Sequence, residues 1–231
     1  MILLRASPHC NGIFTFLDNR NVIKSTSDRS SVKRLEAEIF GYEWYVQNLG
    51  KVNSILSSNF PQTLRNSQGN YIRIQIPFVD GITRPYYLSI AQNFCFLDKV
   101  FDFYTNKWPK TSGFCAVHGD FSLGNLIWSN SDDFTIIDWE HFHECFAPWG
   151  FDLINLVYES VFFSMNDGKL GDQSRKLLVY FKEKYERHSP VNAMKFDLKT
   201  LVDFMKNNRE HWGTSFHKFP VLELDKFDIN D

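Results

Sequence analysis

The sequence predicts an α+β protein in two parts, an antiparallel sheet with one helix in residues 1–80 and a mainly helical part in residues 82–231. Two observations predict this class. Before residue 80, short apolar, β-branched and aromatic runs alternate with turn residues, which is typical of strands. After residue 87, apolar residues recur at intervals of three and four, which is typical of amphipathic helices. No internal repeat is visible, so repeat architectures are excluded.

Three strands are expected at the start, in residues 1–7, 12–18 and 21–26. Their sequences MILLRAS, GIFTFLD and NVIKST are separated by the turn sequences PHCNG and NRN. Pro, Asn and Gly reverse the chain within a few residues, so consecutive strands pair side by side. We therefore expect an antiparallel meander.

One helix is expected next, in residues 30–50, followed by two more strands in residues 60–81. Apolar residues lie three or four apart from Leu35 to Val46, and Gly50 supplies a stop. The segment FPQTLRNSQGNYIRIQIPFVDG contains two β-type runs around a turn with glycine. Together these segments predict a five-stranded sheet with one helix.

The remaining chain is expected to be mainly helical. Residues 87–108 carry apolar side chains at helical spacing, and Pro109 follows their end. Similar patterns predict helices in residues 150–165, 170–187 and 196–209. The change of pattern near residue 80 marks the expected boundary between the two parts.

Charge and hydropathy exclude several classes of partner. Lys and Arg number 25 against 27 Asp and Glu, so no basic field draws the chain to nucleic acid. No apolar run approaches the ~18 residues that span a bilayer, so we expect no membrane insertion. The four cysteines form no CxxC pair, and the N-terminus lacks an apolar leader. We therefore expect reduced thiols and a cytoplasmic protein.

A cluster of polar residues interrupts two apolar runs in the middle of the chain. The segment FCAVHGDFSLGNLIW, residues 114–128, is followed by FTIIDWEHF, residues 134–142. A hairpin formed by NLIW and FTIIDW would bring Asp120, Asn125 and Asp138 together. Their carboxylate and amide oxygens are ligands that Mg²⁺ prefers. The alternative is that these residues only form turns and helix caps.

The pair of motifs HGDFSLGN and IIDWE resembles the aminoglycoside phosphotransferase and choline kinase family, which has a two-lobed protein-kinase-like fold. The resemblance implies a kinase that uses ATP and Mg²⁺ to phosphorylate a hydroxyl of a small molecule. It implies that Asp120 handles the proton of that hydroxyl, and that Asn125 and Asp138 hold the metal. His118 belongs to the same catalytic loop, where we expect a structural role rather than that of a base.

The resemblance also implies a lysine and a glutamate that act on the nucleotide phosphates. Lys24 lies on the third expected strand, after two apolar residues. The following helix offers Glu36 and Glu38 as its partner. We favour Glu38 because Tyr42 and Tyr45, four and seven residues later, resemble the family's Glu-x3-Tyr type of helix, and Glu36 is the alternative.

The nucleotide base and phosphates have expected contacts in the first part. By the resemblance, the interlobe hinge lies near residues 76–81, and backbone from Ile76 to Phe78 meets adenine, with Pro77 offering no N–H. The first turn has backbone N–H groups for phosphate at three positions: Ser7, Asn11 and Gly12.

Three features of the sequence after the motifs suggest structural roles or disfavour a zinc site. Asp152 is expected at a helix start, where the family usually has an Asp that braces the catalytic loop. His141 and His143 have no second ligand cluster, which disfavours zinc. A group of aromatic residues could surround a cationic substrate: Trp139, Phe142, Phe146, Trp149 and Tyr158. We expect most of them to pack in the core instead.

Two other functions compete with a kinase. One is a pseudokinase that binds nucleotide or acts as a scaffold, and the other is a metal-dependent hydrolase. Together Lys24, Asp120, Asn125 and Asp138 favour the kinase, because a scaffold has no need of a full metal set. The acceptor stays open among aminoglycosides, choline or ethanolamine, sugars and protein side chains, and so does the oligomeric state.

Overall fold

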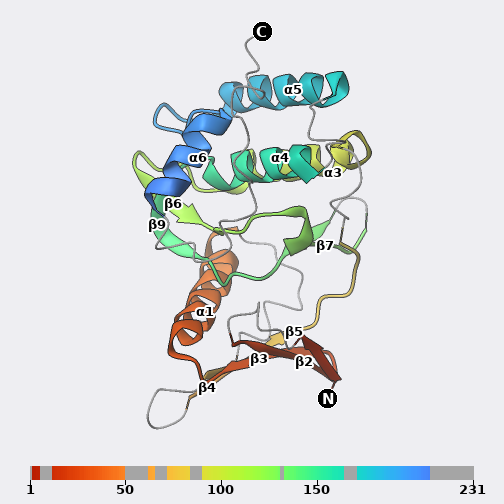
Figure 1. The fold of residues 1–231 in the computed structure, drawn as a ribbon, viewed down its shortest axis with the longest axis vertical. Coiled ribbons are helices and arrows are strands. Elements are labelled where there is room, and N and C mark those ends of the chain that lie inside the picture. Colours follow the sequence, from red (N-terminus) through yellow and green to blue (C-terminus); the bar gives the residue numbers. More distant parts are fainter. Residues whose placement is uncertain are drawn as a thin grey trace.

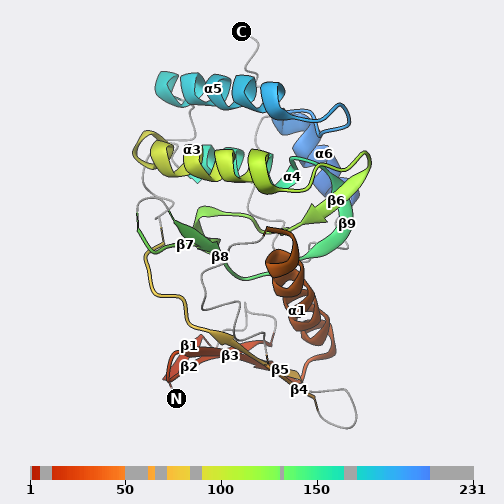
Figure 2. The same cartoon turned by 180° about the vertical axis from the view of Figure 1, so that it is seen from behind.

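The computed structural model describes the larger part of the chain: residues 2–5, 12–49, 62–65, 72–83, 90–130, 133–163 and 171–208. Within these ranges a five-stranded sheet lies at one end of the molecule and four helices lie at the other (Figure 1). Helix α1 and two short strand pairs lie between them (Figures 1 and 2). None of the described helices is both long and apolar enough to cross a membrane.

The five-stranded sheet is antiparallel, as predicted, with the strand order β1-β2-β3-β5-β4. Its turn between β2 and β3 consists of Asn19 and Arg20, which both have positive φ, 51° and 74°. That geometry is the one that suits the twist of a two-residue hairpin. The strands are β1 (Ile2–Arg5), β2 (Phe14–Asp18), β3 (Asn21–Thr26), β4 (Gln62–Arg65) and β5 (Ile72–Pro77).

Helix α1 (Arg29–Leu49) follows β3 and connects the sheet to the rest of the molecule (Figure 2). Asp28 precedes it, and its carboxylate accepts the Ser31 N–H at 3.0 Å, which satisfies one of the exposed donors of the first turn. The buried face of the helix carries Leu35, Tyr42, Tyr45 and Leu49. Their spacing of three to seven residues places them on one side, against the core.

Four helices form the other end: α3 (Ile90–Lys107), α4 (Phe151–Phe163), α5 (Asp172–His188) and α6 (Leu198–Asn207). All four were predicted, with ends that differ by a few residues. Helix α4 is buried on every side from Phe151 to Val161, which its nearly continuous apolar sequence explains. Lys184 of α5 joins α3 through Asp98 and Asp102, at 2.6 Å each.

Two short antiparallel strand pairs carry the polar motifs. β7 (Leu126–Trp128) pairs with β8 (Phe134–Ile136), as the hairpin prediction required. β6 (Phe114–Val117) pairs with β9 (His143–Pro148), a strand that the sequence pattern did not predict. A single 3₁₀ turn, Leu123–Asn125, precedes β7. The second motif therefore lies between two strands that belong to different pairs.

Candidate functional site

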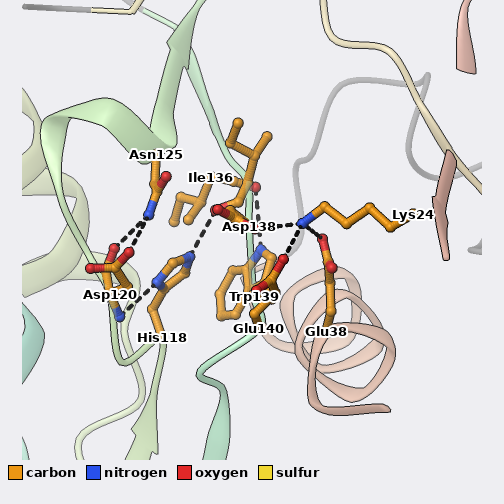
Figure 3. Close-up of polar contacts among 10 residues, drawn as sticks. Lys24, Glu38, His118, Asp120, Asn125, Ile136, Asp138, Trp139 and Glu140 are labelled. Carbon is orange, nitrogen blue, oxygen red and sulfur yellow. Dashed lines mark hydrogen bonds and ion pairs between the residues drawn. The ribbon is translucent and has the colours of Figure 1, made fainter. Parts of the chain in front are cut away.

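Lys24 lies at the centre of a buried ion cluster. Its side chain leaves β3 and is only 8% exposed. Its Nζ lies 2.8 Å from Glu38 Oε1, 2.5 Å from Asp138 Oδ1 and 2.9 Å from Glu140 Oε1 (Figure 3). Burial lowers the pKa of Lys24, but the three carboxylates outweigh it and hold that pKa well above its usual value. The lysine is therefore a fixed positive charge.

Glu38 is the helix residue that meets Lys24, and Glu36 is partly exposed instead. The Glu38 side chain is fully buried, and its Oε1 forms an ion pair with Lys24 at 2.8 Å. Its second oxygen, Oε2, has no hydrogen-bond partner among the described residues. Burial raises the pKa of Glu38 to about 8, although the Lys24 charge acts in the opposite direction.

Asp138 follows β8 in a left-handed backbone conformation, with φ of 65°. Few residues other than glycine adopt this conformation without cost, and Asp is one that tolerates it. Burial by itself would raise the pKa of Asp138, but the charge and hydrogen bond of Lys24 hold it below its usual value. Asp138 is therefore ionised and directed at Lys24 (Figure 3).

Glu140 is the residue of this cluster that sequence reasoning missed. It lies two residues after Asp138 in the motif IIDWE, and its carboxylate accepts a hydrogen bond from Lys24 at 2.9 Å. Asp138 has a left-handed backbone and Glu140 lies in a turn, so no strand alternation links them; the signal that could have identified Glu140 is the second carboxylate within the motif IIDWE. With Glu38 and Asp138 it makes three carboxylates around one ammonium group.

His118 holds the loop of the first motif in place. The Asp120 N–H donates to His118 Nδ1 at 3.2 Å, so the proton of the neutral ring is on Nε2, which donates to the Ile137 carbonyl at 2.9 Å. The ring is fully buried, and burial lowers the pKa of His118. His118 is thus a neutral bridge between the two motifs (Figure 3).

Asn125 and Asp120 contact each other across the loop. Asn125 Nδ2 donates to the Asp120 carbonyl at 2.8 Å and to Asp120 Oδ2 at 3.2 Å. The carboxamide oxygen of Asn125 points away from Asp120 (Figure 3). The Ile137 N–H donates to the Asn125 carbonyl at 3.0 Å, which brings Asn125 next to the residue before Asp138. These hydrogen bonds therefore link Asp120 to Asn125, and Asn125 to the residue that precedes Asp138.

Asp152 supports the same loop from the first turn of α4. Its carboxylate accepts the His118 N–H at 2.7 Å and the Gly119 N–H at 3.0 Å. Burial raises the pKa of Asp152 to about 7, and the two N–H groups act against that rise. Asp152 thus fixes the backbone that carries Asp120.

Only some of the residues expected to contact adenine and the phosphates lie in the described part of the chain. Ser7 and Asn11 lie outside the described residues. Gly12 has φ of 76°, and its carbonyl accepts the Thr26 hydroxyl at 2.9 Å. Ile76 is buried, and the half-exposed Phe78 donates its N–H to the Arg20 carbonyl at 2.7 Å, so that donor is already used.

Strand pairing decides which backbone groups of β5 face β3. Val22 lies opposite Ile76, and the Phe78 bond to Arg20 continues the same register. Hydrogen-bonded pairs alternate along an antiparallel ladder, so Ile76 and Phe78 direct their backbone groups at β3. Pro77, between them, directs its carbonyl to the opposite edge and has no N–H to accompany it.

The donor set fits a hard divalent cation. Among the described residues, Glu38, Asp138 and Glu140 form a group whose ligand atoms lie within 4.8 Å of one another. These carboxyl oxygens are the donors that Mg²⁺ takes. His141 and His143 belong to no such group within the described residues, and the His143 ring stacks on Phe146.

The aromatic residues after Asp138 pack in the core, as expected for most of them. Trp139 and Trp149 are fully buried, and Phe142 and Tyr158 are nearly so. Phe146 is partly buried and packs against the same cluster. Burial leaves Trp139, Phe142, Trp149 and Tyr158 no exposed face for a ligand.

A comparison with protein families places these residues in a wider group. The family model described as "Phosphotransferase enzyme family" matches residues 42–179, more than half of the chain. The match contains both polar motifs and Asp152, and it begins after Lys24 and Glu38. No curated protein matches the chain.

Proposed function

Because the chain belongs to the phosphotransferase enzyme family, we propose that it is an ATP- and Mg²⁺-dependent kinase that phosphorylates a hydroxyl of a small molecule. One observation carries the proposal. Lys24, from a part of the chain that the family match does not include, lies in contact with Asp138 of the second motif and with Glu38. A structural role alone does not require one buried lysine to meet three carboxylates, because burying charges is costly.

The overall arrangement belongs to the same proposal. A two-lobed protein-kinase-like fold would divide the chain into a nucleotide-binding lobe in residues 1–80 and a catalytic, substrate-binding lobe in residues 82–231. The hinge would lie near residues 76–81, where β5 leaves the five-stranded sheet. The ion cluster supports this division because its members come from both sides of the boundary.

Nucleotide binding falls to the first part of the chain in this proposal. Lys24 contacts the α- and β-phosphates, and Glu38 keeps it in position. The segment between β1 and β2, which contains Ser7 and Gly12, would offer N–H groups to the phosphates. Adenine lies beside residues 76–78, where its amino group donates to the Pro77 carbonyl.

Asn125 and Asp138 would hold Mg²⁺, and Glu140 would join them. Their oxygens suit the ion, and the grouping of carboxyl oxygens around Lys24 supports its binding. When bound, the ion neutralises charge on the phosphate oxygens. The chain's own contribution is to hold these oxygens ready, through the Lys24 contacts and the Ile137 bond to Asn125.

Asp120 acts on the acceptor. It orients the acceptor hydroxyl and takes its proton as the oxygen bonds to the γ-phosphorus, while the bond to the β–γ bridging oxygen breaks and ADP leaves. His118 and Asp152 do not touch the reacting atoms. They hold the loop, by bonds to the backbone of residues 118–120, so that Asp120 does not have to be ordered during the reaction.

Thermal melting with nucleotide and metal tests this proposal. ATP with Mg²⁺ should raise the melting temperature well above the value with either alone. At a free concentration of 100 Kd the stabilisation is about 2.7 kcal/mol. An unchanged melting temperature at millimolar ATP and Mg²⁺ would rule the kinase out.

A panel of acceptors then separates a kinase from a pseudokinase. Aminoglycosides, choline, ethanolamine and sugars are incubated with ATP and Mg²⁺, and ADP release is measured. A kinase releases ADP with one of these classes, at a rate that Asp120→Asn reduces. Stabilisation by ATP without transfer to any acceptor would support the pseudokinase instead.

A further inference from the structure

Gly41 lies where α1 passes close to the second motif. A methyl group on Gly41 would lie 2.6 Å from Trp139 Cβ and 2.9 Å from Phe142 Cβ. Ordinary contacts of such a carbon begin at 3.4 Å. All three carbons are attached directly to backbone, so no side-chain rotation relieves the overlap. Any side chain at position 41 therefore moves one backbone segment away from the other.

The backbone of Gly41 gives no other reason for glycine. The residue lies inside α1, with twelve helical residues before it and eight after it, and it has no positive φ. Glycine in a helix interior costs about 1 kcal/mol relative to alanine. Glycine therefore makes the helix less stable at this position than alanine would, but it allows α1 to lie in close contact with Trp139.

Trp139 links three parts of the candidate site. It stands between Asp138 and Glu140 in the sequence and is fully buried. Its ring lies 5.1 Å from the Tyr45 ring of α1 and 4.5 Å from the His118 ring. A shift of Trp139 is therefore passed to the two carboxylates beside it and to the histidine that holds the Asp120 loop.

Glu38 connects this contact to Lys24. Glu38 precedes Gly41 by three residues, so both lie on one face of α1. The same short stretch of helix thus touches Trp139 through Gly41 and Lys24 through Glu38. The distance between the helix and Trp139 sets how far Glu38 lies from Asp138 and Glu140.

We infer that Gly41 is a positioning residue, whose lack of a side chain seats α1 on Trp139 and sets the spacing of the Glu38, Asp138 and Glu140 carboxylates for the metal–nucleotide complex. The inference rests on the proposed function. Gly41 acts through α1 and Trp139 and does not itself contact nucleotide or metal.

The variant Gly41→Ala tests the inference, with Gly171→Ala as its control. A methyl group on Gly171 meets nothing within 4 Å, so the control adds the same atoms without a clash. The probes are Mg²⁺ alone, ATP alone and both together, and binding is measured by calorimetry. The quantity compared is the gain in ATP affinity that Mg²⁺ produces.

Gly41→Ala should reduce this metal-dependent gain by about 10- to 100-fold, the usual effect of disturbing groups that orient metal ligands. Its affinity for metal-free ATP should change much less, and Gly171→Ala should behave as the wild type. A role in folding alone would lower the melting temperature without ligand and leave the gain unchanged. An unchanged gain in Gly41→Ala therefore overturns the inference.

Trp139→Phe covers the case in which Gly41→Ala does not fold. Phenylalanine loses part of the ring that packs between Tyr45 of α1 and His118, so α1 is no longer held at its present distance from the second motif. Its metal-dependent gain should also fall, and a gain equal to that of the wild type overturns the inference. Failure of the proposed function looks different, because Mg²⁺ would then add nothing to ATP binding by the wild type itself.

Discussion

Lys24 Nζ and Asp138 Oδ1 lie 2.5 Å apart, although 114 positions separate the two residues in the sequence. The contact joins β3 of the five-stranded sheet to the segment that follows β8. The same ammonium group also meets Glu38 and Glu140. One ammonium group therefore contacts three carboxyl groups, so loss of Lys24 affects all three at once.

Lys24→Met should destabilise the protein as well as weaken nucleotide binding. Without the ammonium group, the fully buried Glu38 and the partly exposed Asp138 and Glu140 lose their shared partner. Removing one partner of a buried ion pair costs about 3–5 kcal/mol in unfolding free energy. Urea melts should show a loss of that size, part of which Mg²⁺ restores by replacing the missing charge.

Lys33→Met is the matched control, because Lys33 is an exposed residue of α1. It should leave the urea midpoint and the Mg²⁺ response unchanged. Equal stability of Lys24→Met and the wild type would show that the buried carboxylates do not depend on Lys24.

Asp120→Asn and Asp138→Asn should fail in different ways. Asn at position 120 keeps the shape but cannot take a proton, so binding of ATP with Mg²⁺ should persist while kcat falls about 10²- to 10⁴-fold. Asn at position 138 loses the charge that meets Lys24 and the metal, so metal-dependent ATP binding should weaken. Calorimetry and initial rates with an active acceptor distinguish the two. The reverse pattern would invert the roles of the two motifs.

His118 should make stability fall in mild acid. Its folded-state pKa lies below the ordinary value, because the ring is buried and neutral with Nδ1 as an acceptor. The unfolded chain therefore binds the proton first, and stability is lost as the pH falls below about 6.5. The slope for one proton is at most about 1.4 kcal/mol per pH unit.

The comparison with His118→Asn isolates this contribution from the other histidines. Urea melts at pH 7.5 and 5.0 should show a smaller pH-dependent loss in the variant than in the wild type. Parallel pH profiles for the two proteins would mean that His118 does not titrate on unfolding in this range.

Adenine nucleotides should bind more tightly than guanine nucleotides. The proposed base contact is the Pro77 carbonyl, an acceptor with no N–H beside it, and the Phe78 N–H is bonded to Arg20. The adenine amino group complements that acceptor, whereas the guanine carbonyl opposes it. A mispaired buried acceptor costs about 1–3 kcal/mol, so ATP should be preferred over GTP by about tenfold or more. Calorimetry with Mg²⁺ present measures both, and equal affinities would place the base elsewhere.

The sequence by itself determined the order of elements and the residues of the two motifs. The first strands, α1 and the helices after residue 87 follow from local periodicity, because a helix or strand places neighbours in the sequence on a predictable face. The hairpin of β7 and β8 was equally local, since its two strands are separated by a short polar turn.

Tertiary structure decided what the local pattern left open. Strand β9 forms because β6 offers it an edge, and its own residues do not alternate clearly between buried and exposed. Lys24 meets Glu38 rather than Glu36, Glu140 joins the cluster, and Gly41 meets Trp139. The physical reason is the same in each case. Periodicity indicates which side chains share a face of a helix or strand. The residues that this face contacts depend on segments far apart in the chain, because burial and charge interactions between them form only when those segments pack together.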